Sequence, residues 1–225
     1  MEPSFHAEIA RTGNKAEAIV CQDSQSLAAF AAYFGKQISK ASLIPGRKKS
    51  DILLEFTDGT SVRIQNKNGT GGGRGWSVDR RDIKQIPLEE SGQQLLSHVC
   101  LKKGAERPEI CQTPALLQTL LLGSDEQFRP TYFTHSVIDK QTNTIKELWI
   151  SPTETLLERL NQELYPNLVA KKTCVHLSPR LYFQRKGGGS KDHAPDHIQL
   201  KLKSMPDTMT RLLPQTMLQS VEQTP

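Results

Sequence analysis

The chain has 225 residues, about one and a half times the length of a typical domain, and its 29 basic and 24 acidic residues give a formal net charge of +5. Hydrophobic residues make up 36% of the chain, which is enough for a core and argues against a disordered protein. The first residues contain no apolar signal segment, and the longest apolar stretch, 115–122, is far shorter than the roughly 20 residues that span a bilayer. We therefore expect a soluble intracellular protein that does not enter a membrane.

The first predicted elements are two helices within residues 15–34. Apolar residues recur there at helical spacing, and the pattern breaks near 22–24, where Asp23 or Ser24 can cap the second helix. Gly35 is a suitable stop because glycine readily adopts the left-handed conformation that ends many helices.

The rest of the chain predicts a mixture of strands and helices, with a polar tail after Pro206. In chain order these are a loop at 44–46, a β-hairpin at 50–68, helices at 81–103 and 114–122, strands at 131–138 and 144–150, a helix at 152–164 with Pro152 at its first position, strands at 174–177, 180–185 and 197–203, and a short helix at 208–213 within the tail.

This order is typical of an α/β domain with a mixed sheet flanked by helices. We expect a single domain over residues 1–205, with an elaborated C-terminal part at 106–205 and a polar tail at 206–225. The four cysteines, at positions 21, 100, 111 and 174, are scattered and form no C-x-x-C motif, so we expect free thiols.

The side chains of the hairpin predict its register. A turn at 57–59 with Gly59 in the left-handed position makes the numbers of opposite residues sum to 116, and this sorts Ile52, Leu54 and Ile64 onto one apolar face. A two-residue turn, with a sum of 117, would place Ile52 opposite Gln65 and mix the two faces. Because burial of the apolar face specifies register, we expect the sum of 116.

That register places three polar residues on the opposite face. Asp51 is expected directly opposite Gln65, at a β-carbon separation of roughly 4.5–5.5 Å, and Lys67 follows on the same face. A carboxylate and an amide oxygen at this spacing can bind one hard cation such as Mg²⁺. A neighbouring lysine can orient or deprotonate a metal-bound water, or stabilise charge that develops on a phosphate.

Taken in chain order, Glu17 on a helix, Asp51 on a strand and Gln65-Asn66-Lys67 on the next strand resemble the PD-(D/E)xK nuclease superfamily, whose fold is restriction-endonuclease-like. The resemblance covers a core motif at 11–68. It implies that Asp51 binds Mg²⁺, that Gln65 and the Asn66 carbonyl complete the metal site, that Lys67 is the catalytic lysine and that Glu17 assists.

Two positions depart from the motif of this superfamily. Ser50 stands where proline is usual before the aspartate, and Gln65 stands where glutamate or aspartate is usual, which removes one negative charge from the metal site. The resemblance implies a restriction-endonuclease-like mixed sheet with additional C-terminal strands. It also implies a Mg²⁺-dependent DNA endonuclease, with Mn²⁺ as an alternative metal, of the restriction, homing or resolvase kind. Many enzymes that cut both strands are dimers, so a homodimer is an open alternative.

Basic residues concentrate in three segments, at 36–49, 63–84 and 171–203, whereas 106–163 is acidic. This distribution indicates a basic face, which is typical of proteins that bind polyanions. Two glycine-rich loops, at 71–75 and 187–189, lack the P-loop pattern but can approach phosphates through their backbone amides. The DNA-binding residues expected on this basis are Arg47, Lys48, Lys49, Arg74, Trp76, Arg80, Arg81, Arg185, Lys186 and Lys191.

Several alternatives stay open at this stage. The basic residues can be solvated surface groups, the glycine-rich loops can be plain connectors, and Trp76 can anchor a loop to the core instead of contacting a base. For the whole protein the rivals are a non-catalytic nucleic-acid-binding module on the same fold, with Gln65 marking a degraded site, and an assembly protein whose basic face binds an acidic partner.

Overall fold

The computed structural model describes residues 15–46, 48–69, 76–101, 115–139, 141–171, 173–185 and 197–213. A first helix at 15–22 precedes the other helices, α2 (Ser24–Phe34), α3 (Glu90–Leu96), α4 (Ala115–Leu122) and α5 (Thr153–Asn161). Short helical turns are η1 (Ile83–Gln85), η2 (Ser97–Leu101) and η3 (Glu126–Phe128). The strands are β1 (Ile38–Leu43), β2 (Ile52–Phe56), β3 (Ser61–Asn68), β4 (Ser77–Asp82), β5 (Tyr132–Ile138), β6 (Ile145–Pro152), β7 (Val169–Lys171), β8 (Cys174–His176), β9 (Leu181–Arg185), β10 (His197–Leu202) and β11 (Thr210–Leu213).

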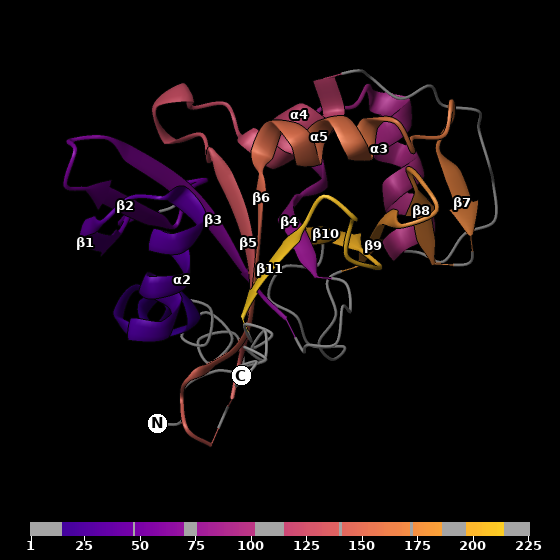
Figure 1. Ribbon diagram of the computed structural model, residues 1–225. Helices are drawn as coiled ribbons and strands as arrows, with labels where there is room; N and C mark the ends of the chain where they lie inside the picture. The colour runs from indigo at the N-terminus through magenta and orange to yellow at the C-terminus, as the bar shows by residue number, and fades with distance from the viewer. Residues whose placement is uncertain are drawn as a thin grey trace, which may run out of the picture.

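Within the described residues the strands form two sheets (Figure 1). The first has six strands in the order β1-β2-β3-β5-β6-β11, and it is mixed because β3 and β5 run parallel while the other neighbours are antiparallel. The second has five strands in the order β4-β10-β9-β8-β7, all antiparallel. The prediction of a mixed sheet flanked by helices, with additional C-terminal strands, is confirmed.

Hydrophobic packing covers both faces of the first sheet. On one face the first helix and α2 bury Val20 and Phe30 against the hairpin residues Ile52, Leu54 and Ile64. On the other face lies the larger core, which joins the first sheet to α4, α5 and the second sheet. Its buried members include Leu117, Leu120, Phe133, Leu156 and Phe183. The first sheet is therefore a central layer, and its two faces meet different partners.

The helix break and the hairpin register are confirmed. Asp23 caps α2, since its Oδ2 accepts a hydrogen bond from the Ser26 N–H at 2.8 Å, and Gly35 ends the helix with φ of 62°. In the hairpin, Ile52 pairs with Ile64, so the numbers of opposite residues sum to 116 as expected. Gly59 has φ of 81° in the turn, a conformation that side chains with a β-carbon rarely adopt.

The structure corrects several sequence-based elements. Residues 208–213 do not form a helix, because 210–213 pair with β6 as the edge strand β11. The segment predicted as helix from residue 81 begins instead as strand β4, and Pro152 is the cap before α5 rather than its first residue. Strands β1 and β7 were not predicted. These elements owe their conformation to pairing with distant strands, which local periodicity does not report.

Two further expectations concern the membrane and the cysteines. None of the helices in the described ranges is long and apolar enough to cross a membrane. Cys21, Cys100 and Cys174 are free thiols, as expected, while Cys111 lies outside the described residues.

The cap of α2 gives a test of the local structure. Replacing Asp23 with alanine removes the acceptor for the Ser26 N–H, and we expect a loss of about 1 kcal/mol in the free energy of unfolding. Urea denaturation followed by circular dichroism measures it. Ser24→Ala, one residue further along, is the control; an equal loss in both variants would contradict the cap assignment.

Candidate active site

The segment that leads into β2 is held against the connection between α4 and β5. The Ser50 side chain is buried, and its Oγ donates to the Phe128 carbonyl at 2.6 Å while its N–H donates to the same oxygen at 3.2 Å. Lys48 Nζ lies 4.0 Å from the centre of the Phe128 ring and 3.6 Å from Asp125 Oδ2. These contacts fix the backbone immediately before Asp51, at the position where the superfamily motif has proline.

Asp51 does not continue the regular ladder of the hairpin. Its N–H donates to the Ile64 carbonyl at 2.8 Å, a pairing whose numbers sum to 115, so the expected direct pairing with Gln65 is not formed. Instead the Asp51 carboxylate reaches across to β3, where Oδ2 accepts a hydrogen bond from the Asn66 N–H at 2.9 Å. The carboxylate consequently lies beside the Gln65-Asn66-Lys67 segment, although by a different route from the one predicted.

The electrostatics bring Glu17, Asp51 and Lys67 into one group. Burial is the main cause that raises the pKa of the Glu17 carboxyl to about 7, and repulsion from Asp51 adds to it. Attraction to Lys67 acts in the opposite direction and lowers the pKa. Burial also raises the pKa of Asp51, although Lys67, the hydrogen bond from the Asn66 N–H and Lys49 each act to lower it. Two carboxylates and an ammonium group thus interact at the ends of β2 and β3. Both acids are placed where a further positive charge would favour their ionised forms.

Gln65 and Asn66 play different structural parts. Gln65 is buried, and within the described structure its Oε1 has no hydrogen-bond partner. The Asn66 side chain is fully engaged with β5, because it accepts from Thr134 Oγ1 at 2.9 Å and donates to Ser136 Oγ at 3.0 Å. The Asn66 side chain is therefore not available to a cation, which leaves the role of its carbonyl as a prediction.

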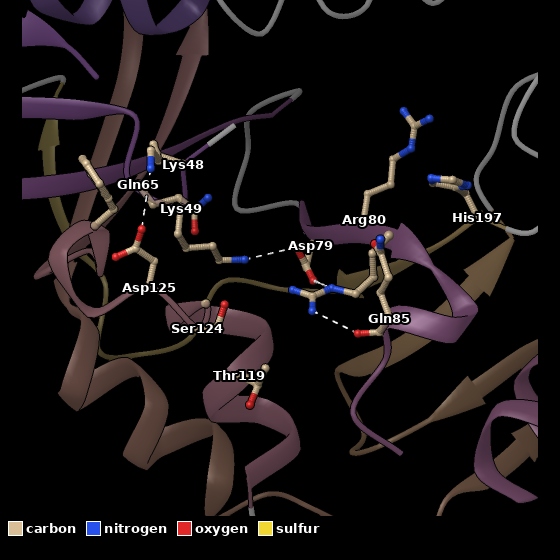
Figure 2. Close-up of a pocket in the computed structure, with 13 residues that line it drawn as sticks. Lys48, Lys49, Gln65, Asp79, Arg80, Gln85, Thr119, Ser124, Asp125 and His197 are labelled. Atoms are coloured by element: carbon tan, nitrogen blue, oxygen red, sulfur yellow. Dashed lines mark hydrogen bonds and ion pairs between the residues drawn. The ribbon is translucent and has the colours of Figure 1, made fainter. Parts of the chain in front are cut away.

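A polar cleft of about 750 Å³ opens beside Gln65 (Figure 2). Its lining residues are Lys48, Lys49, Gln65, Asp79, Arg80, Arg81, Gln85, Thr119, Gly123, Ser124, Asp125, Phe128 and His197. Figure 2 shows Lys49 reaching from the segment before β2 toward Asp79 on β4. The cleft thus lies between the hairpin of the first sheet, α4 and the first strand of the second sheet.

The predicted DNA-binding residues divide into four groups. Lys48, Lys49, Arg80 and Arg81 line the cleft together, and Arg185 lies at the exposed end of β9 outside it. Trp76 is buried at 3% exposure and stacks on His135 with ring centroids 4.9 Å apart, so this placement supports the alternative of a core anchor over contact with a base. The other four, Arg47, Arg74, Lys186 and Lys191, lie outside the described residues.

Sequence reasoning missed three side chains of the site. Asp79 lies on β4, a strand with too few apolar residues to be recognised, and binds both Lys49 and Arg81. Asp125 pairs with Lys48 from the loop after α4. His135 is the neighbour of Lys67 on β5, and burial lowers its pKa to about 4, so it is neutral and adds no positive charge beside that lysine. No local pattern of the sequence signals these three.

The oxygen ligands near Asp51 suit a hard divalent cation, but they are few. Asp51 and Glu17 offer carboxylate oxygens, and the buried Gln65 Oε1 is an oxygen without a partner; Mg²⁺ prefers such ligands and keeps several waters. Across the described ranges no three His, Cys, Asp or Glu side chains gather into a metal-binding group. Gln65 in place of a carboxylate accounts for part of that shortage.

Comparisons with known proteins add little to this picture. Neither the known protein families nor the curated proteins match the sequence. Among solved structures, the chain is similar to restriction endonuclease MspI, solved in complex with its cognate DNA, with a TM-score of 0.47 and 13% sequence identity over 79% of this chain and 76% of that one.

The raised pKa of Glu17 predicts how stability changes with pH. The folded state binds this proton more tightly than the unfolded state, so the contribution of Glu17 to the free energy of unfolding decreases as pH rises from about 4.5, the ordinary value, to about 7. The raised pKa of Asp51 acts in the same direction. The lowered pKa of His135 acts in the opposite direction between about 4 and its ordinary value of 6.5, in the wild type and in the variant alike. We expect Glu17→Gln to remove the Glu17 contribution, so that from pH 5 to pH 7.5 its stability falls less, or rises more, than that of the wild type.

The measurement is urea denaturation of both proteins at pH 5 and pH 7.5. Glu55→Gln, at a glutamate on the hairpin outside this group, is the matched control and should retain the wild-type dependence. Equal pH dependence in the wild type and in Glu17→Gln would contradict the burial of Glu17 beside Asp51.

Proposed function

We propose that the protein is a Mg²⁺-dependent DNA endonuclease that hydrolyses phosphodiester bonds. The observation that carries this proposal is the electrostatic grouping of Glu17, Asp51 and Lys67, with the Asp51 carboxylate bound to the Asn66 N–H. The preceding residue on β3, Gln65, has an unpaired side-chain oxygen and lines a cleft with basic side chains. Restriction, homing and resolvase-like roles share this chemistry.

Each residue of the group has a chemical part in this proposal. Asp51 and Gln65 would hold the metal with the Asn66 carbonyl, and Glu17 would add a carboxylate. When bound, Mg²⁺ supplies Lewis-acid stabilisation of the phosphate and acidifies a water. Lys67 holds the attacking water and stabilises negative charge that develops on the phosphate oxygens. The second oxygen of Asp51 is left for the cation, because the Asn66 N–H occupies Oδ2.

The cleft supports a polyanionic substrate. Four cationic side chains line it, Lys48, Lys49, Arg80 and Arg81, against the two carboxylates Asp79 and Asp125. An excess of positive charge in a cleft attracts phosphates and makes binding sensitive to salt. DNA is the polyanion that the superfamily resemblance implies, and a homodimer stays a prediction.

The rival favoured by a specific observation is a non-catalytic nucleic-acid-binding module. Gln65 is neutral, so the site has one negative charge fewer than the superfamily motif, which weakens its attraction for a cation. This rival retains salt-sensitive DNA binding without metal-dependent cleavage. An assembly protein that binds an acidic partner would show neither.

The first test is cleavage of plasmid and branched DNA with Mg²⁺ or Mn²⁺. We expect the wild type to cut only with metal, and Lys67→Ala to lose at least roughly 100-fold in rate, as expected for the loss of a group that acts on the reacting water. Lys40→Ala, at an exposed lysine on β1, is the control and should cut normally. Salt-sensitive binding without cutting in either metal would favour the non-catalytic module, and absence of DNA binding would favour the assembly protein.

The second test restores the missing charge. Gln65→Glu should raise the affinity for Mn²⁺ by roughly tenfold, because a carboxylate is a stronger ligand for a hard cation than an amide. Isothermal titration calorimetry without DNA measures it. Gln85→Glu adds the same charge elsewhere in the cleft and is the matched control; an equal gain there would show that the effect is long-range and that Gln65 is not a ligand.

A further inference from the structure

A buried ion cluster crosses the cleft and connects β4 to the segment before Asp51. Lys49 Nζ lies 3.1 Å from Asp79 Oδ1, and Arg81 Nε lies 2.6 Å from Asp79 Oδ2. Both Lys49 and Asp79 are only 13% exposed. We propose that Asp79 is a positioning residue that holds Lys49 in the cleft and away from Asp51, so that the Asp51 carboxylate remains available to a divalent cation; this rests on the proposed function.

Lys49 would compete with a cation for Asp51 if it were released. The two residues are separated by Ser50 alone, and the charge of Lys49 already acts on the Asp51 carboxyl, where it favours the ionised form. A lysine ammonium is a compact charge on a flexible stem of four carbons, so it can turn toward a neighbouring carboxylate. Lys67 already acts on the same carboxylate. A second ammonium would occupy the oxygen that a metal needs.

The observed contacts hold the Lys49 ammonium against β4 and α4. Its ammonium donates to Asp79 Oδ1 and to the Leu120 carbonyl, which uses two of its three donors. Asp79 is itself held, since Arg81 donates to its Oδ2 at 2.6 Å and to the Gln85 carbonyl at 3.2 Å. Lys49 is therefore anchored to α4 and β4 while it lines the cleft.

The free-energy cost of burying the charges of Lys49, Asp79 and Arg81 favours a functional reason for this cluster. Burial acts to raise the pKa of Asp79, but attraction from Lys49 and Arg81 outweighs burial and lowers it. Burial lowers the pKa of Lys49 to about 8. Removing several charges from water is costly, and their mutual attraction only partly offsets that cost, so such clusters are weak evidence for stability. An apolar pair would join β4 to the loop at a lower cost, but it would not hold an ammonium group.

The experiment measures Mn²⁺ affinity by isothermal titration calorimetry on the full chain without DNA. Asp79→Asn should weaken binding roughly 10- to 100-fold, the usual cost of losing a partner outside the metal's own ligands. Asp79→Asn combined with Lys49→Met should return the affinity to within about twofold of the wild type, because the competing ammonium is gone. Asp207→Asn removes a carboxylate from an ion pair with Arg159 that does not line the cleft, and it should leave the affinity unchanged.

The outcomes separate this inference from the proposed function. If the wild type binds Mn²⁺ and Asp79→Asn binds equally well, or if the double variant is as weak as the single one, the positioning role is wrong while the endonuclease proposal stands. If the wild type binds no metal, both are overturned. Should Asp79→Asn alone fail to fold, as judged by circular dichroism, wild-type affinity in the double variant still supports the role, and a loss there overturns it.

Discussion

Burial of the apolar face of the β2–β3 hairpin is the constraint on which the rest of the site depends. Ile52, Leu54 and Ile64 pack under the first helix and α2, and a slip of one residue would turn all of them toward the cleft. The same constraint turns Gln65 and Lys67 toward the opposite face. It also brings the first helix, which carries Glu17, against the hairpin.

The ladder stops being regular at Asp51, the residue that we propose as a metal ligand. Asp51 leaves its place opposite Gln65 and uses its carboxylate to accept the Asn66 N–H, a bond that a backbone carbonyl makes elsewhere in a sheet. Ser50 makes this possible because its side chain and N–H are both bound to the Phe128 carbonyl. The chain therefore holds a partly buried carboxylate at a fixed place without the proline of the superfamily motif.

The lysine charges in the cleft are held in place by specific contacts. Lys48 is bound to Asp125 and the Phe128 ring, and Lys49 to Asp79, so neither lysine is a loose surface cation. Under the proposed function, fixed charges would act on a phosphate more strongly than mobile ones, because they need no reorganisation when it binds. The acidic partners reduce the net charge of the cleft but define where its positive charge lies.

The sequence by itself determined the elements whose information is local. The helix break at Asp23, the stop at Gly35 and the hairpin register follow from capping, turn chemistry and the pattern of apolar residues, and each is confirmed. The grouping of Glu17, Asp51, Gln65 and Lys67 was predicted from the superfamily resemblance and from that register, but the structure brings Asp51 to β3 through its carboxylate and not through direct pairing with Gln65. Only the tertiary structure decided the other wall of the cleft. Asp79 and Arg80 lie on a polar strand that exists because β10 pairs with it, and β11 forms because β6 offers it an edge. Pairing between distant segments leaves no periodic trace in a short polar stretch, which is why Asp79 could not be recognised before the fold was known.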